Sequence, residues 1–261
     1  MKRNDLQDRL KLKRKIIKIF NKKVRRKSSN TKRSNANHDG KEGHWLEKQM
    51  GLSHNGKNEP DMFGFEMKNG TKGKTTFGDW SASNYLFKSK KNPTSTITKD
   101  DFLKIFGKPN PAKGNRYSWS GEPCPKIKNY NSFGQKLQID KNGSILVIYN
   151  YSKDSRPKKS KIVPKQFQIN KLILAKWDSE WMKKKVESKF NKNGWFKCIR
   201  NKSGVYSQIG FGDPINYKIW LSYVKTGDIF FDSGMCQGNS RNYSHWRASN
   251  KIWDRLIKNV Y

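Results

Sequence analysis

Residues 60–68 read Pro60-Asp61-Met62-Phe63-Gly64-Phe65-Glu66-Met67-Lys68. Gly64 indicates a tight turn, and residues 65–68 then alternate apolar and polar, which is typical of a half-buried strand. Because neighbouring side chains on a strand point to opposite faces, Glu66 and Lys68 share the face that points away from the core. The stretch therefore predicts a strand that presents a carboxylate beside an ammonium group, with Asp61 just before it.

These three side chains have the chemistry of a metal-dependent phosphodiesterase site. Mg²⁺ prefers carboxylate oxygens and keeps several waters, so Asp61 and Glu66 suffice as protein ligands. Lys68 can orient or help to deprotonate the attacking water and offset negative charge on the phosphate. The same spacing also occurs on solvated strand edges, so the rest of the chain has to decide between the two interpretations.

The composition predicts a folded protein whose partner is a polyanion. The chain has 261 residues, enough for one large domain or two lobes. Its mean hydropathy is −1.01, yet nine Trp, ten Tyr and fourteen Phe supply large groups for a core. A formal charge of +35 favours nucleic acid as the partner, with an anionic membrane surface as the second candidate.

Other classes of protein are excluded by the same sequence. No apolar run reaches the length of a membrane span, and the charged N-terminal residues do not form a signal peptide. Cys124, Cys198 and Cys236 provide neither a disulfide framework nor a CxxC zinc pair. We therefore expect no membrane partner and a cytoplasmic location.

Periodicity predicts the order of the main elements. Residues 4–26 form a basic amphipathic helix with its basic side toward phosphates, followed by a basic loop over 27–43. A short helix near Trp45 carries Glu47, and residues 62–80 indicate a hairpin of two strands. Thr98 is the expected N-cap of a helix that ends at Gly107. Residues 108–136 indicate a long surface loop bearing aromatic candidates for base contact.

The C-terminal part contains a polar loop with the side chains that read bases. A strand over 228–232 precedes a loop with two glycines, which let the backbone approach a partner closely. Arg pairs with guanine and Asn with adenine in the major groove. The candidates for DNA contact are Asn239, Arg241, Tyr243, His245 and Arg247, with Lys74 in the turn of the predicted hairpin.

The order of these motifs resembles a known family. The helix at Gly43-His44-Trp45-Leu46-Glu47, then Pro60-Asp61, then Phe65-Glu66-Met67-Lys68 is similar to the MutH-like branch of the PD-(D/E)xK nucleases. Within that branch the chain resembles the MvaI/BcnI/LlaMI-type type II restriction endonucleases, most clearly over residues 40–87 and more weakly from 227 to 247.

This resemblance implies a fold and a division of the chain. The fold class is α/β (α+β), the restriction-endonuclease-like fold, with a mixed central sheet flanked by helices and two lobes forming a DNA cleft. The expected parts are a basic N-terminal helix and loop (1–43), a catalytic core (44–107), and the remaining sheet with the DNA-recognition lobe (108–261).

The resemblance also implies an activity and roles for individual residues. A hydrolase of this type cuts double-stranded DNA at a short CC-N-GG-like pseudopalindrome, with Mg²⁺ and as a monomer, beside a cognate DNA methyltransferase. Asp61 and Glu66 would hold Mg²⁺, Lys68 would be the third signature residue, and Glu47 the additional acidic residue supplied by the helix. Asp232, Arg241 and Arg247 are the corresponding candidates for base reading.

Two other functions remain open from the sequence. One is a MutH-like DNA repair endonuclease that nicks one strand under the control of a partner protein. The other is a non-catalytic nucleic-acid-binding protein, for which the net charge of +35 would suffice. Cleavage of both strands by the protein alone would argue against the first. A Glu66→Ala protein that behaves as the unmodified protein does would favour the second.

Overall fold

The computed structural model describes residues 3–31, 41–52, 57–70, 73–88 and 92–261. The chain divides into two compact units. The first comprises Met1–Thr75, Val186–Asn216 and Ser249–Tyr261, and the second comprises Thr76–Lys185 and Tyr217–Ala248. Each unit draws on distant parts of the chain, so neither is a continuous segment.

The first unit is built on a mixed sheet in the order β1-β9-β10-β14. Strand β1 runs parallel to β9, and the other two pairs are antiparallel. Its elements are α1 (Arg3–Lys23), α2 (Lys41–Met50), β1 (Glu66–Asn69), β9 (Trp195–Arg200), β10 (Tyr206–Gly212), α7 (Asn250–Leu256), β14 (Ile257–Val260) and the last turn of α5 (Ser179–Phe190).

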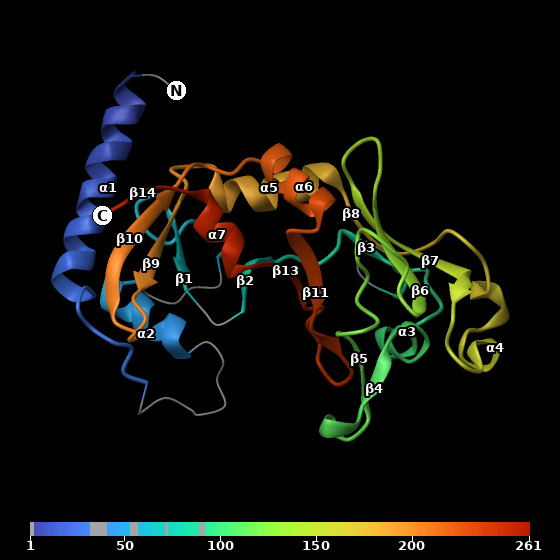
Figure 1. Ribbon diagram of the computed structural model, residues 1–261. Coiled ribbons are helices and arrows are strands. Elements are labelled where there is room, and N and C mark those ends of the chain that lie inside the picture. The colour runs from blue at the N-terminus through green and yellow to red at the C-terminus, as the bar shows by residue number, and fades with distance from the viewer. Residues whose placement is uncertain (1–2, 32–40, 53–56, 71–72, 89–91) are drawn as a thin grey trace. The chain divides into compact units, whose positions relative to one another are not determined.

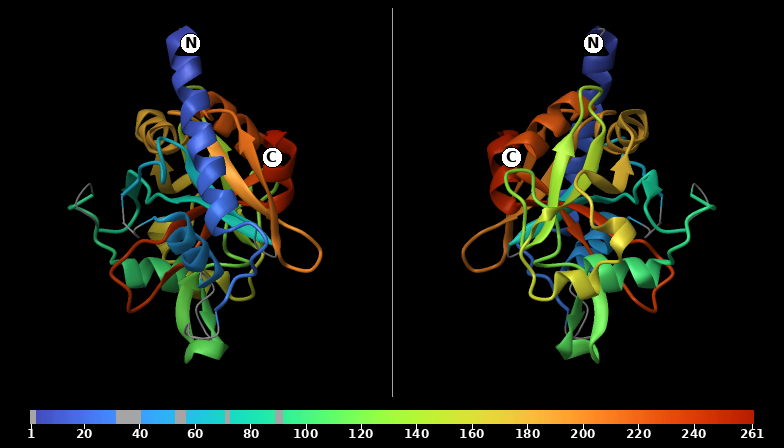
Figure 2. Two further views of the ribbon diagram at one scale, coloured as in Figure 1. Left: turned by 90° about the vertical axis from the view of Figure 1, so that its left-hand side faces the viewer. Right: turned by 90° about the vertical axis from the view of Figure 1, so that its right-hand side faces the viewer.

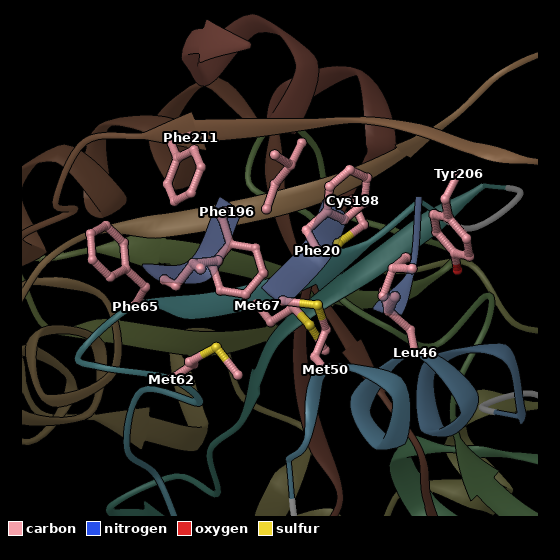
Figure 3. Close-up of a cluster of buried hydrophobic side chains, with 13 residues drawn as sticks. Phe20, Leu46, Met50, Met62, Phe65, Met67, Phe196, Cys198, Tyr206 and Phe211 are labelled. Carbon is pink, nitrogen blue, oxygen red and sulfur yellow. The ribbon is translucent and has the colours of Figure 1, made fainter. Parts of the chain in front are cut away.

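Helices α1 and α2 pack on one face of this sheet, and α1 runs along β10 and β14 (Figures 1 and 2). The apolar stripe predicted for the first helix, Leu6, Leu10, Ile17, Phe20 and Val24, is confirmed only in its second half. Phe20 and Val24 are fully buried and Ile17 is partly buried, whereas Leu6 and Leu10 are 47% and 43% exposed. Ile16, Phe20 and Val24 are the fully buried residues of the helix. They join Leu46 and Met50 of α2 in a cluster with apolar residues of the turn and the sheet (Figure 3), namely Met62, Phe65, Met67, Phe196, Cys198, Tyr206, Ile209 and Phe211. The cluster fixes both helices on this face.

The second unit contains three small sheets and is rich in buried aromatic rings. Trp246 makes edge contacts with Trp177 and Trp220, with ring centroids 5.4 and 5.1 Å apart. Its elements are most of β2 (Lys74–Asp79), β3 (Asn84–Tyr85), α3 (Lys99–Phe106), β4 (Lys108–Asn110), η1 (Pro111–Lys113), β5 (Arg116–Trp119), β6 (Phe133–Ile139), β7 (Ile145–Asp154), α4 (Lys159–Ile162), η2 (Lys165–Phe167), β8 (Leu172–Trp177), most of α5, α6 (Tyr217–Thr226), β11 (Ile229–Ser233), β12 (Met235–Cys236) and most of β13 (Ser244–Ser249).

The sheet order is β3-β8-β7-β6 in the four-stranded sheet, and β11-β13-β2 and β12-β5-β4 in the others. The helix predicted from Thr98 is confirmed with both hydrogen bonds of a capping box between Thr98 and Asp101. The cap satisfies backbone groups at the start of α3, and its four buried apolar side chains then turn into the unit. Local capping and periodicity thus determine this element.

Two predicted elements are wrong. The hairpin over 62–80 does not form, because β1 pairs with β9 of the first unit whereas β2 belongs to the sheet of β11 and β13. The long loop over 108–136 contains the antiparallel pair β4 and β5. Trp119 in that segment has no exposed surface and donates to Gln135 Oε1 at 2.7 Å, so it is a core residue rather than a candidate for base contact.

Some sequence predictions fall outside the described residues. These are residues 32–40 of the basic loop and residues 71 and 72 of the predicted turn. Within the described ranges, no helix combines the length and the apolar character that crossing a bilayer requires.

Candidate active site

A two-residue turn determines the spacing between Asp61 and Glu66. Met62 and Phe65 exchange both backbone hydrogen bonds, at 2.9 and 2.8 Å. Phe63 and Gly64 between them have positive φ angles of 49° and 78°, as a type I′ turn requires. The turn is fixed from outside as well, because a side chain at Gly64 would approach Asn193 Nδ2 to 2.7 Å. Asp61 is therefore returned to the start of β1.

The Asp61 carboxylate is oriented by β1 itself. Its Oδ2 accepts the backbone N–H of Met67 at 2.8 Å, and the residue remains exposed to solvent. This hydrogen bond directs the carboxylate toward the strand that carries Glu66 and Lys68. The electrostatic influence of Asp61 reaches both, since it raises the pKa of each as a minor contribution.

Glu66 and Lys68 form a buried ion pair on one face of β1. Lys68 Nζ lies 2.7 Å from Glu66 Oε1, and their side chains are 8% and 3% exposed. The shared face was predicted correctly, but the strand is not half-buried. Phe190 and Trp253 lie over it, with ring centroids 5.2 and 5.6 Å from Lys68 Nζ. The second apolar layer comes from residues far along the chain, which the local alternation cannot reveal.

Burial changes the proton affinity of both groups. Removal from water is the largest influence on Glu66 and raises the pKa of its carboxyl group, against the attraction of Lys68 and Lys189. The same removal lowers the pKa of Lys68, against the attraction of Glu66. Each group is therefore closer to a change of protonation at neutral pH than it would be in water.

Lys189, at the end of α5, is a further member of the site. Its Nζ lies 3.2 Å from Glu66 Oε1, the oxygen that also receives Lys68, and its side chain is 20% exposed. Sequence reasoning missed it. Four lysines occur between residues 183 and 189, and no local pattern distinguishes the one that reaches Glu66.

A second buried lysine, Lys197, lies next to Lys68. The parallel register of β1 and β9 places Lys197 beside Lys68 on the same face. Its side chain is 7% exposed and its Nζ lies 2.6 Å from Asp254 Oδ1 on α7. Asp254 is 59% exposed, so it can neutralise Lys197 from the solvent side. This part of the site is electropositive, which suits an anionic ligand.

Glu66 has the free oxygen that a metal ion needs. Oε1 is occupied by the two lysines, whereas Oε2 is buried with no hydrogen-bond donor among the described residues. An orphaned buried carboxylate oxygen is costly unless it has a ligand. With the exposed Asp61 carboxylate before it, Glu66 fits a hard cation such as Mg²⁺, which takes few protein oxygens.

Glu47 is placed on α2, as predicted, but outside a three-carboxylate group. Its Oε2 lies 3.4 Å from His44 Nδ1, one turn earlier on the same helix. Within the described residues, no three His, Cys, Asp or Glu side chains gather in a way that could hold a metal ion. The structure therefore brings Glu66, Lys68 and Lys189 together with Asp61 alongside, and it places Glu47 beside His44 on α2.

The candidates for DNA contact gather in the second unit. Strands β11 and β13 pair so that Asp232 is opposite His245, and Asp232, His245 and Arg247 share one face. Arg247 Nε and Asp232 Oδ2 are 3.3 Å apart as an ion pair, although Nε makes no hydrogen bond within the described residues. The pair fixes a basic and an acidic group side by side.

The loop before β13 holds the remaining candidates of that unit. Arg241 is 61% exposed, lies 2.8 Å from Asp79 Oδ2, and sits 4.9 Å above the ring of Tyr243. Tyr243 in turn stacks on His245, whose pKa is lowered by burial. The Asn239 side chain accepts the backbone N–H of Arg241 at 2.9 Å. Lys74 begins β2 as an exposed residue of the other unit and is not part of this group.

A comparison with known families decides the identity. The family model described as LlaMI restriction endonuclease matches residues 24–261. The chain belongs to the LlaMI restriction endonuclease family. It is 42% identical over 266 residues to the type II restriction enzyme ScrFI of Lactococcus lactis subsp. cremoris, covering 95% of this chain and 98% of that enzyme. The resemblance read from the motifs is confirmed.

The fold of this family member is also seen in a solved structure. The complex of restriction endonuclease MvaI with its cognate DNA substrate matches with a TM-score of 0.58 at 13% identity, covering 100% of this chain and 98% of that one. At that identity the likeness shows the fold, which is the expected PD-(D/E)xK type. The LlaMI family member is an enzyme, a site-specific deoxyribonuclease of the type II restriction class.

The raised pKa of Glu66 predicts the acid limit of the family member's activity. If Glu66 holds the cation, as proposed below, only its ionised carboxylate can do so, and cleavage is lost as the pH falls through the pKa of the folded protein. We expect half-maximal activity at a pH above roughly 4.3, the ordinary value for glutamate, because burial raises the pKa. A pH profile of single-turnover rates, with DNA binding measured in parallel, checks this. An acid limb at or below the ordinary value would contradict it.

Proposed function

We propose that this enzyme hydrolyses phosphodiester bonds of double-stranded DNA in a Mg²⁺-dependent reaction at a short CC-N-GG-like pseudopalindrome. One observation carries the proposal. One carboxylate oxygen of the buried Glu66 lies close to the ammonium groups of Lys68 and Lys189. The other carboxylate oxygen has no hydrogen-bond donor in the described part of the chain. That arrangement suits a cation on one side of the carboxylate and a phosphate near the lysines.

Asp61 and Glu66 are the residues that would hold Mg²⁺. The ion, when bound, supplies positive charge against the phosphate and increases the acidity of water. The Asp61 carboxylate contributes a ligand oxygen that the N–H of Met67 keeps in place. The free Oε2 of Glu66 contributes the other. Glu47, on α2, stays a candidate for an outer role through water rather than a direct ligand.

Lys68 is the proposed acid–base and electrostatic group. Its ammonium lies against Glu66 in a nearly dry environment, where positive charge acts more strongly on a phosphate than it would in water. Its lowered pKa also makes Nζ able to accept a proton from the attacking water nearer to neutral pH than an ordinary lysine. Phe190 and Trp253 restrict the position of the side chain.

Lys189 is proposed as a positioning residue that keeps Glu66 ionised and oriented. We expect Lys189→Met to slow cleavage about tenfold, since the loss of its ion pair with the buried Glu66 carboxylate should cost about 1.5 kcal/mol. Its loss also removes a charge that lowers the pKa of Glu66, so the acid limb of the pH profile moves to higher pH. Single-turnover rates across the pH range give both values.

Lys183, exposed on the same helix, provides the matched control for this substitution. Lys183→Met is expected to leave both the rate and the acid limb unchanged. Lys189→Arg keeps the charge near Glu66 and should restore most of the rate. An unshifted acid limb in Lys189→Met would remove Lys189 from the positioning role, because a general loss of stability does not move a pKa.

Recognition is proposed to reside in the second unit. Asp232, Arg241 and Arg247 are the base-reading candidates, with Asn239, Tyr243 and His245 around them and Lys74 as a further DNA contact. Their support is the exposed guanidinium of Arg241 and the ordered acid–base pair on β11 and β13. ScrFI is named a type II restriction enzyme and MvaI was solved with its DNA substrate, which agrees with duplex DNA as the partner.

The proposal includes the setting in which the enzyme works. It acts as a monomer in the cytoplasm, in a system with a cognate DNA methyltransferase that protects the host sites and makes no contact with it. The alternative enzymatic function is that of a MutH-like repair endonuclease, which nicks one strand of the DNA.

Digestion of unmethylated plasmid and phage DNA tests the proposal. We expect discrete fragments with Mg²⁺ and none with EDTA, and sequencing of the fragment ends gives the recognition site. Nicked circles alone would favour the repair nickase. Tight, salt-dependent binding without any cleavage would instead support a non-catalytic DNA-binding protein.

A further inference from the structure

Helix α1 carries a row of exposed basic side chains on one side. At about 100° of rotation per residue, the five members lie within an arc of about 100°. We call this row the basic ridge, and it consists of Lys11, Arg14, Lys15, Lys18 and Lys22. All five are exposed, so the ridge is a surface feature along most of the helix.

The opposite side of α1 is held firmly by the first unit. Ile16, Phe20 and Val24 are completely buried in the cluster on the sheet (Figure 3). Lys13 Nζ donates to Asn259 Oδ1 at 3.1 Å, and Arg9 Nε donates to the backbone oxygen of Asn193 at 2.9 Å. The helix therefore cannot roll, and the ridge stays directed away from the sheet.

The charges of the ridge have little internal compensation. Lys11 lies 3.7 Å from Asp8, and both side chains are 71% exposed, so that pair is weak. For Arg14, Lys15, Lys18 and Lys22, the described residues offer no carboxylate within ion-pair distance. A row of uncompensated cations on a fixed helix is a binding surface for an extended anion.

The ridge and the cleavage site lie on opposite sides of one sheet. Glu66 and Lys68 point to the face covered by Phe190 and Trp253. Helix α1 packs on the other face, where Phe65 and Met67 point. The sheet and a helix about 10 Å thick therefore separate the ridge from Glu66. A phosphate that reaches Glu66 is thus on a different side of the unit from one that meets the ridge.

We propose that the basic ridge binds a second segment of duplex DNA, without sequence preference, while the cleavage site holds the first. The ridge spans about 16 Å from Lys11 to Lys22. A duplex presents about one negative charge per 1.7 Å of its axis, so a segment of that length meets all five cations. An anionic membrane is disfavoured as the partner, because Ile16, Phe20 and Val24 of α1 are buried in the core, which leaves Leu6 and Leu10 as its exposed large apolar side chains.

This surface would let the enzyme pass between segments of a long DNA without release into solution. It goes beyond the cleavage proposed above. The family model begins at residue 24, so the match does not include α1. A short duplex has no second segment for the ridge to bind, so the ridge should not affect the rate at which a short duplex is cleaved.

The test counts duplexes bound per protein in EDTA by analytical ultracentrifugation, with short duplexes carrying the site found by sequencing. We expect two per chain for the unmodified protein and one for the triple variant R14E/K18E/K22E. The control K141E/K161E/K202E makes the same change of charge at exposed positions elsewhere and should still bind two. Cleavage of the short duplex with Mg²⁺ should be equal in all three proteins.

A milder variant separates binding from folding. R14Q/K18Q/K22Q, checked by circular dichroism, should lower the salt dependence of the second binding event by about 3 in log–log slope, near 0.9 per lost phosphate contact. A single duplex bound per unmodified chain would overturn the proposal. Loss of the second duplex in the control K141E/K161E/K202E as well would also overturn it. Ridge variants that lose binding only to phosphatidylserine vesicles would also overturn it. If the protein bound two duplexes but cleaved neither, the proposed cleavage function would be contradicted and the proposed second binding surface would stand.

Discussion

Glu66→Gln is expected to abolish cleavage while leaving DNA binding intact. Glutamine has nearly the same size, so it fits the buried position under Phe190 and Trp253. The substitution removes the negative charge of the carboxylate. That charge is shared by Oε2, which has no hydrogen-bond donor in the described structure, and by Oε1, which lies near Lys68 and Lys189. Loss of a preorganised charged group at a reaction centre typically costs about 10³-fold in rate.

The expected loss applies to chemistry rather than to affinity. Single-turnover cleavage with excess enzyme measures the rate, and fluorescence anisotropy in the absence of Mg²⁺ measures binding. Glu59→Gln, at an exposed position shortly before Asp61, is the matched control and should cut normally. A Glu66→Gln enzyme that cuts within tenfold of the unmodified protein would show that the reaction centre lies elsewhere.

Replacement of Lys68 is expected to have the next largest effect. Lys68→Met keeps the volume and the apolar stem beneath the aromatic rings but removes Nζ, so the cleavage rate falls about 10²- to 10³-fold. Folding should survive, because Lys189 still neutralises Glu66 after the substitution. Thermal melting alongside single-turnover cleavage separates the two effects.

Lys68→Arg distinguishes a proton acceptor from a simple positive charge. Arginine stays protonated at any pH where the protein is folded, and its planar group needs more room than the pocket around Nζ provides. We therefore expect Lys68→Arg to be as inactive as Lys68→Met. Recovery of most of the rate in the arginine variant would show that Lys68 acts through its charge alone.

The grouping of the proposed catalytic residues could be read from the sequence because it is local. Asp61, Glu66 and Lys68 lie within eight residues, and strand alternation alone places the last two on one face. The Thr98 cap and the buried half of the apolar stripe of α1, Phe20 and Val24, were equally readable, since each is determined by neighbours one or two turns away.

What the sequence did not reveal depends on contacts across long separations. Lys189 approaches Glu66 only because α5 ends over β1, and nothing within α5 marks that residue. The hairpin over 62–80 was wrong for the same reason, since the partner of β1 is β9, which begins at Trp195. Trp119 looked like an exposed aromatic in a polar segment, whereas its indole is paired with Gln135 in the core. Local composition carries no information about such partners.

The parallel pairing of β1 with β9 has a consequence for the order of events during synthesis. When residues 60–68 leave the ribosome, the strand they form has no neighbour, because its partner begins at Trp195 and the strand that closes the sheet begins at Ile257. Lys189 and Trp253, which contact Glu66 and Lys68, are also made late. A nascent chain therefore carries the cleavage signature long before it carries a working site. If residues 61–68 form the cleavage site, as proposed, an unfinished chain still lacks the lysine and the aromatic ring that complete its surroundings.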